Sequence, residues 1–222
     1  MPRKRPFDID EVLSRIRQTV PAFADAAMFD LAERGHHGLF AQLVACIISI
    51  RTLDEVSLPA SLRLLGQAPD AASVAALSAQ EIDALIRPST FHERKARQIL
   101  EIARRTLAEH GGELPCEYAV LTGFSGVGPK CASLALGIAC GGAHIAVDVH
   151  VHRVTNRWGY VRTSHPDATM EALKRTLPPS YWVEINRLLV PFGKHVCTRV
   201  RPHCSTCPVL EYCRQVGVTT PR

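Results

Sequence analysis

Apolar residues recur at intervals of three and four along almost the whole chain, and Leu39, Leu43 and Ile47 form a representative run. This spacing places apolar side chains on one face of an α-helix, whereas a β-strand would need alternation with a period of two. Alternation of that kind is nearly absent from the sequence. The chain is therefore predicted to be an all-α protein.

Local signals indicate where some of these helices start and stop. Ser78-Ala79-Gln80-Glu81 has the spacing of a capping box, which begins a helix. Gly111-Gly112 follows a long basic segment that starts near His92, and glycine in this position typically ends a helix. We therefore expect one helix to begin after Ser78 and another to run from His92 to Gly111.

Composition limits the class of protein and its compartment. The 222 residues are 46% hydrophobic and 21% charged with a net charge of +5, which suits one or two globular domains and permits a polyanionic partner. The best candidate for a membrane helix, residues 134–149, is interrupted by glycines and by Asp148, so we expect no membrane association. No apolar signal segment follows the basic residues 2–6, and a cytoplasmic, reducing location is expected.

A glycine-rich turn at residues 123–130 separates two helical patterns. Gly126 and Gly128 are expected to supply the positive φ angles of a tight helix-hairpin-helix turn. Amide groups that such a turn leaves exposed at a helix N-terminus can bind a phosphate. An ordinary connection between two helices is the alternative for this motif.

Lys130 opens the helix expected at residues 130–140, where the positive end of the helix dipole disfavours the ammonium form. A neutral amine there could act as a nucleophile, and a lysine that contacts phosphate is the alternative. Asp148 could cap a helix over residues 149–158, accept a proton, or stabilise a developing sugar cation. His150 and His152 are two positions apart and would diverge on a helix, so joint metal binding is not expected.

Four cysteines near the C-terminus have the spacing C-x6-C-x2-C-x5-C, and they are Cys197, Cys204, Cys207 and Cys213. Four thiolates suit either a tetrahedral zinc ion or an iron–sulfur cube, and the absence of two paired knuckles favours iron–sulfur. The loop between the first two carries Arg199 and Arg201, either as a phosphate-binding patch or as a solvated loop. The remaining cysteines, Cys46, Cys116, Cys131 and Cys140, are expected to be core thiols.

Taken together, these motifs resemble the endonuclease III family of DNA base-excision glycosylases in the helix-hairpin-helix superfamily. The resemblance runs over most of the chain and rests on the hairpin lysine, the downstream aspartate and the cysteine spacing in that order. Further matching segments are residues 47–55, 91–96 and 147–153.

The resemblance implies a six-helix barrel over residues 32–142 and a second domain over residues 1–31 and 143–222 that carries a [4Fe-4S] cluster on the four cysteines. It implies that Lys130 is the nucleophile and Asp148 its activating carboxylate, facing each other across the interdomain cleft. The implied activity is removal of oxidised pyrimidines from double-stranded DNA, with strand cleavage at the abasic site by β-elimination. A monomer, associated with the nucleoid in a bacterium, is expected.

The resemblance also assigns DNA contacts. Arg51 takes the position of a gap-filling glutamine and Phe91 that of an apolar wedge, while Gly126, Val127, Gly128, His150, Arg199 and Arg201 are assigned to DNA binding. Without the resemblance, Arg51 would be read as a surface arginine and Phe91 as a core residue. Ser125, Thr90 and Arg51 depart from the family pattern and bear on substrate choice. A mismatch-specific glycosylase, a lyase for abasic sites only, a non-catalytic damage-binding module and a structural zinc protein are the alternatives.

Overall fold

The computed structural model describes residues 4–222, and within that range it contains helices, turns and loops but no strand. The all-α prediction is confirmed. No helix in this range combines the length and apolar composition that crossing a bilayer requires. The chain divides into two compact units, of which one comprises Ala27–His144 and is called here the hairpin unit. The other comprises Met1–Ala26 and Ile145–Arg222 and is called the cysteine unit. The sequence predicts residues 32–142 for the first of these units.

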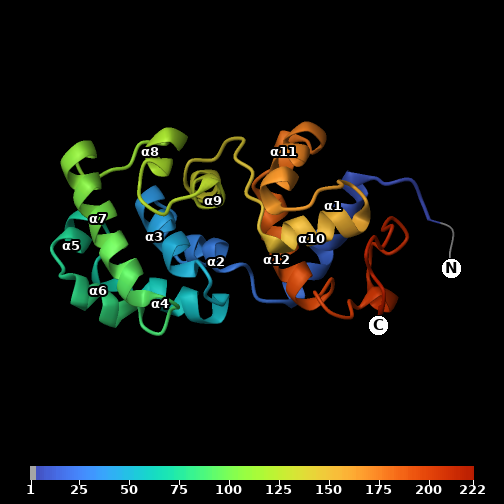
Figure 1. Cartoon of the computed structure of the whole chain (residues 1–222), viewed down its shortest axis with the longest axis horizontal. Coiled ribbons are helices and arrows are strands. Elements are labelled where there is room, and N and C mark those ends of the chain that lie inside the picture. The colour runs from blue at the N-terminus through green and yellow to red at the C-terminus, as the bar shows by residue number, and fades with distance from the viewer. Residues whose placement is uncertain (1–3) are drawn as a thin grey trace. The chain divides into compact units, whose positions relative to one another are not determined.

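The hairpin unit is built around one helix that is buried on every side. Its helices are α2 (Ala27–Glu33), α3 (Leu39–Ser49), α4 (Asp54–Gln67), α5 (Ala71–Ala75), α6 (Ala79–Ile86), α7 (His92–His110), α8 (Tyr118–Thr122) and α9 (Pro129–Ala139). All residues of α3 from Leu39 to Ile48 are buried, as expected for a central helix. Helices α4, α7 and α9 pack against α3, and α7 also runs along α5 and α6 (Figure 1).

Local capping interactions account for the helix boundaries of this unit that the sequence predicted. The Glu81 amide donates to Ser78 Oγ at 3.2 Å and the Ser78 amide donates to Glu81 Oε2 at 2.7 Å, which completes the capping box of α6. Helix α7 ends at Gly111, whose φ of 64° lies in the left-handed region. Both predicted boundaries are confirmed.

The cysteine unit combines the start of the chain with its C-terminal part. Its α-helices are α1 (Ile9–Thr19), α10 (Val149–Trp158), α11 (Pro166–Thr176) and α12 (Glu184–His195). Helix α12 packs against α1 and α10, and α11 packs against α10 (Figure 1). Trp158 and Phe192 are the largest fully buried side chains of its core. The four clustered cysteines lie beyond α12, in a segment of turns and one short 3₁₀ helix.

One prediction about the cysteines is wrong. Cys116 and Cys140 form a disulfide, with their Cα atoms 6.1 Å apart, instead of the two core thiols that the sequence predicted. The two residues are 24 positions apart, and they meet because Cys116 lies in the loop after α7 while Cys140 caps the end of α9. Cys46 and Cys131 are buried free thiols, as expected.

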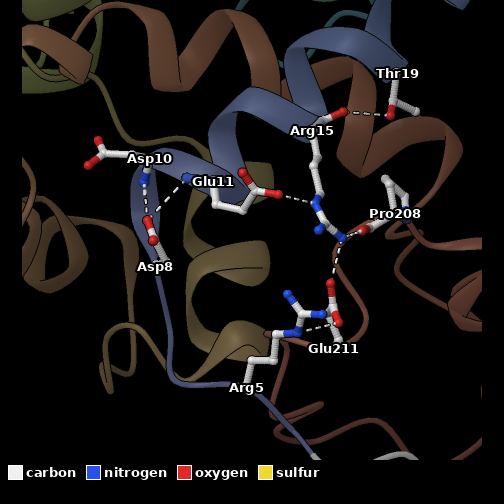
Figure 2. A network of polar contacts seen from close by, with 8 residues as sticks. All are labelled: Arg5, Asp8, Asp10, Glu11, Arg15, Thr19, Pro208 and Glu211. Carbon is white, nitrogen blue, oxygen red and sulfur yellow. Dashed lines mark hydrogen bonds and ion pairs between the residues drawn. The ribbon is translucent and has the colours of Figure 1, made fainter.

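An ion-pair network ties α1 to the cysteine-bearing segment of the same unit (Figure 2). Arg15 donates to Glu11 Oε1 at 2.6 Å, to Glu211 Oε1 at 2.7 Å and to the Pro208 carbonyl at 3.1 Å. Arg5 pairs with the second oxygen of Glu211 at 2.8 Å. Glu211 therefore joins two cations of the N-terminal segment to the turn between Cys207 and Cys213.

Replacing Glu211 with glutamine is expected to lower the melting temperature by about 2 °C, because two ion pairs at one carboxylate are lost but both are partly exposed. The difference should narrow in high salt, which screens exposed charges. Thermal unfolding followed by circular dichroism measures both effects. Glu171→Gln, which removes a single exposed pair to Lys174, is the control and should leave the melting temperature unchanged. Equal shifts in the two variants would assign no structural role to the Glu211 network.

Candidate functional site

The glycine turn joins α8 to α9 and needs only one of its glycines for backbone reasons. Gly126 has a φ of 77°, in the left-handed region. Gly128 has a φ of −90° and a ψ of 175°, so the predicted positive φ at this position is wrong. Gly128 is the extended N-cap residue of α9, a conformation that other residues also adopt. The single reversal at Gly126 is enough to turn the chain into the helix.

Two apolar side chains anchor this turn in the hairpin unit. Phe124 and Val127 are buried, and the Val127 amide donates to the Phe124 carbonyl at 3.2 Å. Gly126 and Gly128 are exposed, and their amides make no backbone hydrogen bond to the part of the chain that the structure describes. The turn can therefore offer two amide donors to an anion, whereas the Val127 amide is already used within the turn. A DNA contact by Val127 stays a prediction.

Lys130 is the second residue of α9, one position after Pro129, and its side chain is half-buried. Two buried thiols, Cys46 of α3 and Cys131 of α9, lie close to it. The pKa of Cys46 is lowered mainly by a hydrogen bond from Cys131, and the positive charge of Lys130 acts in the same direction. The burial of both thiols followed from the sequence, but the proximity of Cys46 to Lys130 did not, because it depends on the packing of α3 on α9.

Asp148 is the N-cap of α10 in the cysteine unit. Its Oδ1 atom accepts hydrogen bonds from the amides of His150 at 2.8 Å and Val151 at 2.9 Å. The capping role that the sequence allowed is thus confirmed, and helix α10 has the predicted bounds, 149–158. The residue is half-buried, with its carboxylate at the positive end of the α10 dipole.

His150 and His152 point to different partners, as their spacing predicted. The His150 Nδ1 atom lies 3.1 Å from an Arg153 nitrogen, and the His152 Nδ1 atom lies 2.6 Å from Thr169 Oγ1. Gly193 of α12 makes room for His150, because a Cβ atom at this glycine would come within 2.6 Å of the His150 ring. His150 therefore contributes to packing of α10 on α12, and its assignment to DNA binding stays a prediction.

Arg51 and Phe91 are both exposed residues of the hairpin unit with left-handed backbone. Their φ angles are 53° and 57°, and Phe91 is 59% exposed. A positive φ in a residue other than glycine is strained, and surrounding contacts must hold it. Phe91 is therefore not the core residue that its apolar side chain alone suggests. An exposed aromatic ring held in a strained backbone is consistent with insertion into a partner.

The four C-terminal cysteines line one cavity of the cysteine unit. Phe192, Leu210 and Val218 contribute apolar walls to this cavity. Burial and the neighbouring thiols raise the pKa of Cys207 to about 12 and that of Cys213 to about 11. Within residues 4–222, no group of three or more potential ligands is placed to hold a single metal ion.

Hydrogen-bond donors approach two of these sulfur atoms. The Gln215 amide donates to Cys213 Sγ at 3.3 Å, and Arg157 donates to Cys197 Sγ at 3.4 Å. Donors aimed at sulfur favour the thiolate form. These donors suit thiolate ligands at two of the four sulfur atoms, whereas the Cys213 thiol also donates to the Arg157 carbonyl at 3.3 Å. The four cysteines in one cavity fit a cationic centre, whose charge would favour the thiolate form.

The loop after Cys197 is held from α10 by Arg157, which donates to the carbonyls of Thr198 at 2.7 Å and Arg199 at 2.8 Å. Thr198 Oγ1 adds hydrogen bonds to the carbonyls of Val200 and Arg201. The guanidinium groups of Arg199 and Arg201 belong to exposed residues on this braced loop. Such an arrangement suits contacts with phosphates, which stay a prediction.

Comparison with known proteins places the chain in a family. Residues 44–179 match the HhH-GPD superfamily of base excision DNA repair proteins. The chain belongs to this superfamily. The sequence-based assignment to the endonuclease III family is confirmed by its relatives. The matched segment includes Arg51, Phe91, Lys130 and Asp148 but ends before the cysteine segment.

Relatives of this HhH-GPD chain carry endonuclease III names. Endonuclease III of Thermotoga maritima is 35% identical over 78% of this chain and 82% of its own length. Endonuclease III homolog 2, chloroplastic, of Arabidopsis thaliana is 35% identical over 97% of this chain. The chain spans 60% of that longer relative. The structure of a trapped endonuclease III–DNA covalent intermediate matches with a TM-score of 0.78 and 25% identity, over 93% of this chain and 94% of the other.

Proposed function

We propose that this HhH-GPD protein is a bifunctional DNA glycosylase and abasic-site lyase of base excision repair, acting on oxidised pyrimidines in double-stranded DNA. The observation that carries the proposal is the placement of Lys130 at the start of α9, two positions after the exposed Gly128 and four after the exposed Gly126. An amine is thereby coupled to a backbone loop suited to the sugar–phosphate chain. The similarity to a trapped covalent endonuclease III–DNA complex supports the same chemistry.

The proposed reaction begins with extrusion of the damaged nucleotide from the base stack. The Lys130 amine attacks C1′ of the deoxyribose, the bond from C1′ to the base breaks, and the base leaves as an anion that takes up a proton from water. Asp148 accepts the proton that the attacking amine loses, or stabilises positive charge on the sugar. Opening of the sugar gives an imine, loss of a C2′ proton expels the 3′ phosphate by β-elimination, and hydrolysis of the imine regenerates Lys130.

We assign DNA binding to residues described above. We propose that Arg51 fills the gap left by the extruded nucleotide and that Phe91 inserts as a wedge, which lowers the cost of the unstacked state. The amides of Gly126 and Gly128 hold the backbone near the lesion, and Val127 and His150 are proposed as further DNA contacts, each from its own unit. Arg199 and Arg201 bind phosphates further along. We further propose that the protein acts as a monomer, in the cytoplasm or nucleoid where the DNA lies.

We propose that Cys197, Cys204, Cys207 and Cys213 hold a [4Fe-4S] cluster. The shared cavity and the donors that approach the sulfur atoms support this, and the endonuclease III relatives support it independently. When bound, the cluster supplies a covalent crosslink among four points of a segment that lacks α-helix. This crosslink would fix the loop of Arg199 and Arg201 for phosphate binding.

Replacing Cys207 with serine is expected to remove most of the iron and sulfide from the purified protein, because one of four thiolate ligands is lost. Metal analysis and visible absorbance measure the loss, and Cys131→Ser, which changes a buried cysteine of the hairpin unit, should retain the metal. Iron and sulfide at wild-type levels in Cys207→Ser would contradict the ligand assignment. A wild-type protein that contains zinc without iron would contradict the cluster itself.

Arg201→Ala is expected to weaken binding to duplexes of any sequence alike, because its guanidinium group contacts a phosphate. The slope of log affinity against log salt should become shallower by about 0.9 for the one phosphate contact removed. Fluorescence anisotropy over a salt series measures this slope. Arg162→Ala, which removes another arginine of the cysteine unit, is the control. If the salt slope of Arg201→Ala equals that of the wild type, Arg201 is a solvated surface arginine that does not contact a phosphate.

Incubation with duplexes that carry an oxidised pyrimidine, a mismatched thymine or an abasic site tests the function directly. Base release, strand cleavage and covalent trapping by borohydride are scored separately. The proposal predicts all three on the oxidised pyrimidine. Strand cleavage restricted to abasic sites, or base release restricted to mismatches, would change the proposed substrate class. DNA binding without any product would show that the protein is a non-catalytic damage-binding module.

A further inference from the structure

Lys95, in the second turn of α7, is buried with only 4% of its surface exposed, and the proposed chemistry does not use it. Its amine donates three hydrogen bonds toward one short segment. The acceptors are the carbonyl oxygens of Ile48 and Ile50, both at 2.7 Å, and Thr52 Oγ1 at 3.0 Å. The three donors of one ammonium group are thus all used on the segment that contains Arg51.

The acceptors lie where α3 ends, at Ser49. Helix C-termini leave carbonyl groups without intrahelical partners and carry partial negative charge, so a cation there is stabilising. Burial lowers the pKa of Lys95 to about 8, and the amine therefore remains largely protonated at neutral pH. Lys95 acts as a cap on α3 supplied by a different helix.

Thr52 extends this contact to the second inserting residue. Its Oγ1 atom accepts hydrogen bonds from Lys95 Nζ at 3.0 Å and from the Thr90 amide at 3.1 Å. Thr90 immediately precedes Phe91. Arg51 and Phe91 both have a left-handed backbone. Arg51 adjoins Thr52, which carries this hydroxyl group, and Phe91 adjoins Thr90, whose amide donates to it. One buried amine and one hydroxyl connect the two strained positions.

We propose that Lys95 is a positioning residue that, through Thr52, holds the Arg51 and Phe91 loops in a fixed mutual geometry for insertion into the DNA stack. The inference rests on the proposed function, because it gives these two side chains a shared task. Two side chains that enter one opened base stack must keep a fixed distance from each other. If the segments that carry them were flexible, part of the binding free energy would be spent on ordering those segments. Lys95 touches neither the DNA nor the reacting atoms in this role.

The test compares duplex and single-stranded substrates, because only a duplex has a stack to open. Lys95→Met keeps an unbranched side chain, shorter by one atom, and removes all three donors. It is expected to slow excision of an oxidised pyrimidine from duplex DNA about tenfold, the order expected when a buried charged hydrogen-bond group is removed. Cleavage of a single-stranded abasic oligonucleotide should stay within about twofold of wild type, which is small on this energy scale. The fluorescence of 2-aminopurine opposite the lesion, which rises on unstacking, should rise less than with wild type.

Controls separate this role from general stability and from the proposed function. Arg104→Met changes an exposed cation on the same helix and should behave as wild type. Thr52→Val removes the shared hydroxyl with little change in shape, and it decides the matter if Lys95→Met does not fold. An unchanged ratio of duplex to single-strand rates in the folded variants overturns the role of Lys95. A wild-type protein that processes neither substrate overturns the proposed function instead.

Discussion

Replacing Lys130 with glutamine is expected to abolish borohydride trapping on damaged or abasic DNA, with a loss of at least about three orders of magnitude. The amide of glutamine cannot form an imine, so the covalent intermediate and β-elimination are lost together. Glutamine is nearly as good a helix former as lysine, and the start of α9 should be unaffected. The trapped complex is measured on denaturing gels, and strand cleavage is measured in parallel.

Lys174→Gln is the matched control, since Lys174 is an exposed lysine on α11 that pairs only with a nearby carboxylate in the described contacts. It should trap as wild type does. Melting temperatures of both variants show whether the fold is retained. If Lys130→Gln were trapped at the wild-type rate, the nucleophile would be another amine. Base release that persists without strand cleavage would keep the glycosylase activity but assign it to attack by water.

Replacing Asp148 with asparagine is expected to slow base excision by about 10² to 10⁴, the range typical for loss of a positioned acid–base or electrostatic group. This substitution separates the catalytic role of the Asp148 carboxylate from its role as the N-cap of α10. Asp148 caps α10 through one oxygen that accepts two amide hydrogen bonds, and asparagine offers the same oxygen without the charge. Single-turnover excision measures the rate, and thermal unfolding measures the fold.

Two further variants complete this comparison. Asp148→Ala should slow excision in the same way but also lower the free energy of unfolding by about 1 kcal/mol, because the cap is lost. Asp8→Asn is the control, since Asp8 caps α1 of the same unit through two similar amide hydrogen bonds and has no proposed chemistry. Asp148→Asn with wild-type excision would reduce Asp148 to a capping residue.

Most predictions that depended on neighbouring residues hold in the structure. The capping box at Ser78, the helix end at Gly111 and the cap at Asp148 involve groups within a few positions of one another, so their interactions can be read from spacing. The family assignment likewise rested on short motifs in a fixed order. The helical period was sufficient for the fold class, because nearly every segment shows it.

Most errors and omissions arose where distant parts of the chain meet. Cys116 and Cys140 are far apart in sequence, and no local pattern indicates that the ends of α7 and α9 bring them together. Gly128 is a local exception: the glycine-rich turn predicts a positive φ at both glycines, although Gly126 alone reverses the chain. The exposure of Phe91 depends on the packing of α7, which an apolar side chain by itself does not reveal.

The amino-acid sequence by itself determined the helices, their caps, the hairpin with its lysine and the membership of a repair family, because short-range hydrogen bonds and apolar periodicity specify them. Only the tertiary structure decided that Lys95 reaches the end of α3 and that Thr52 joins the loops of Arg51 and Phe91. Each of these depends on packing between elements that are separated along the chain, and packing is a property of the whole folded unit.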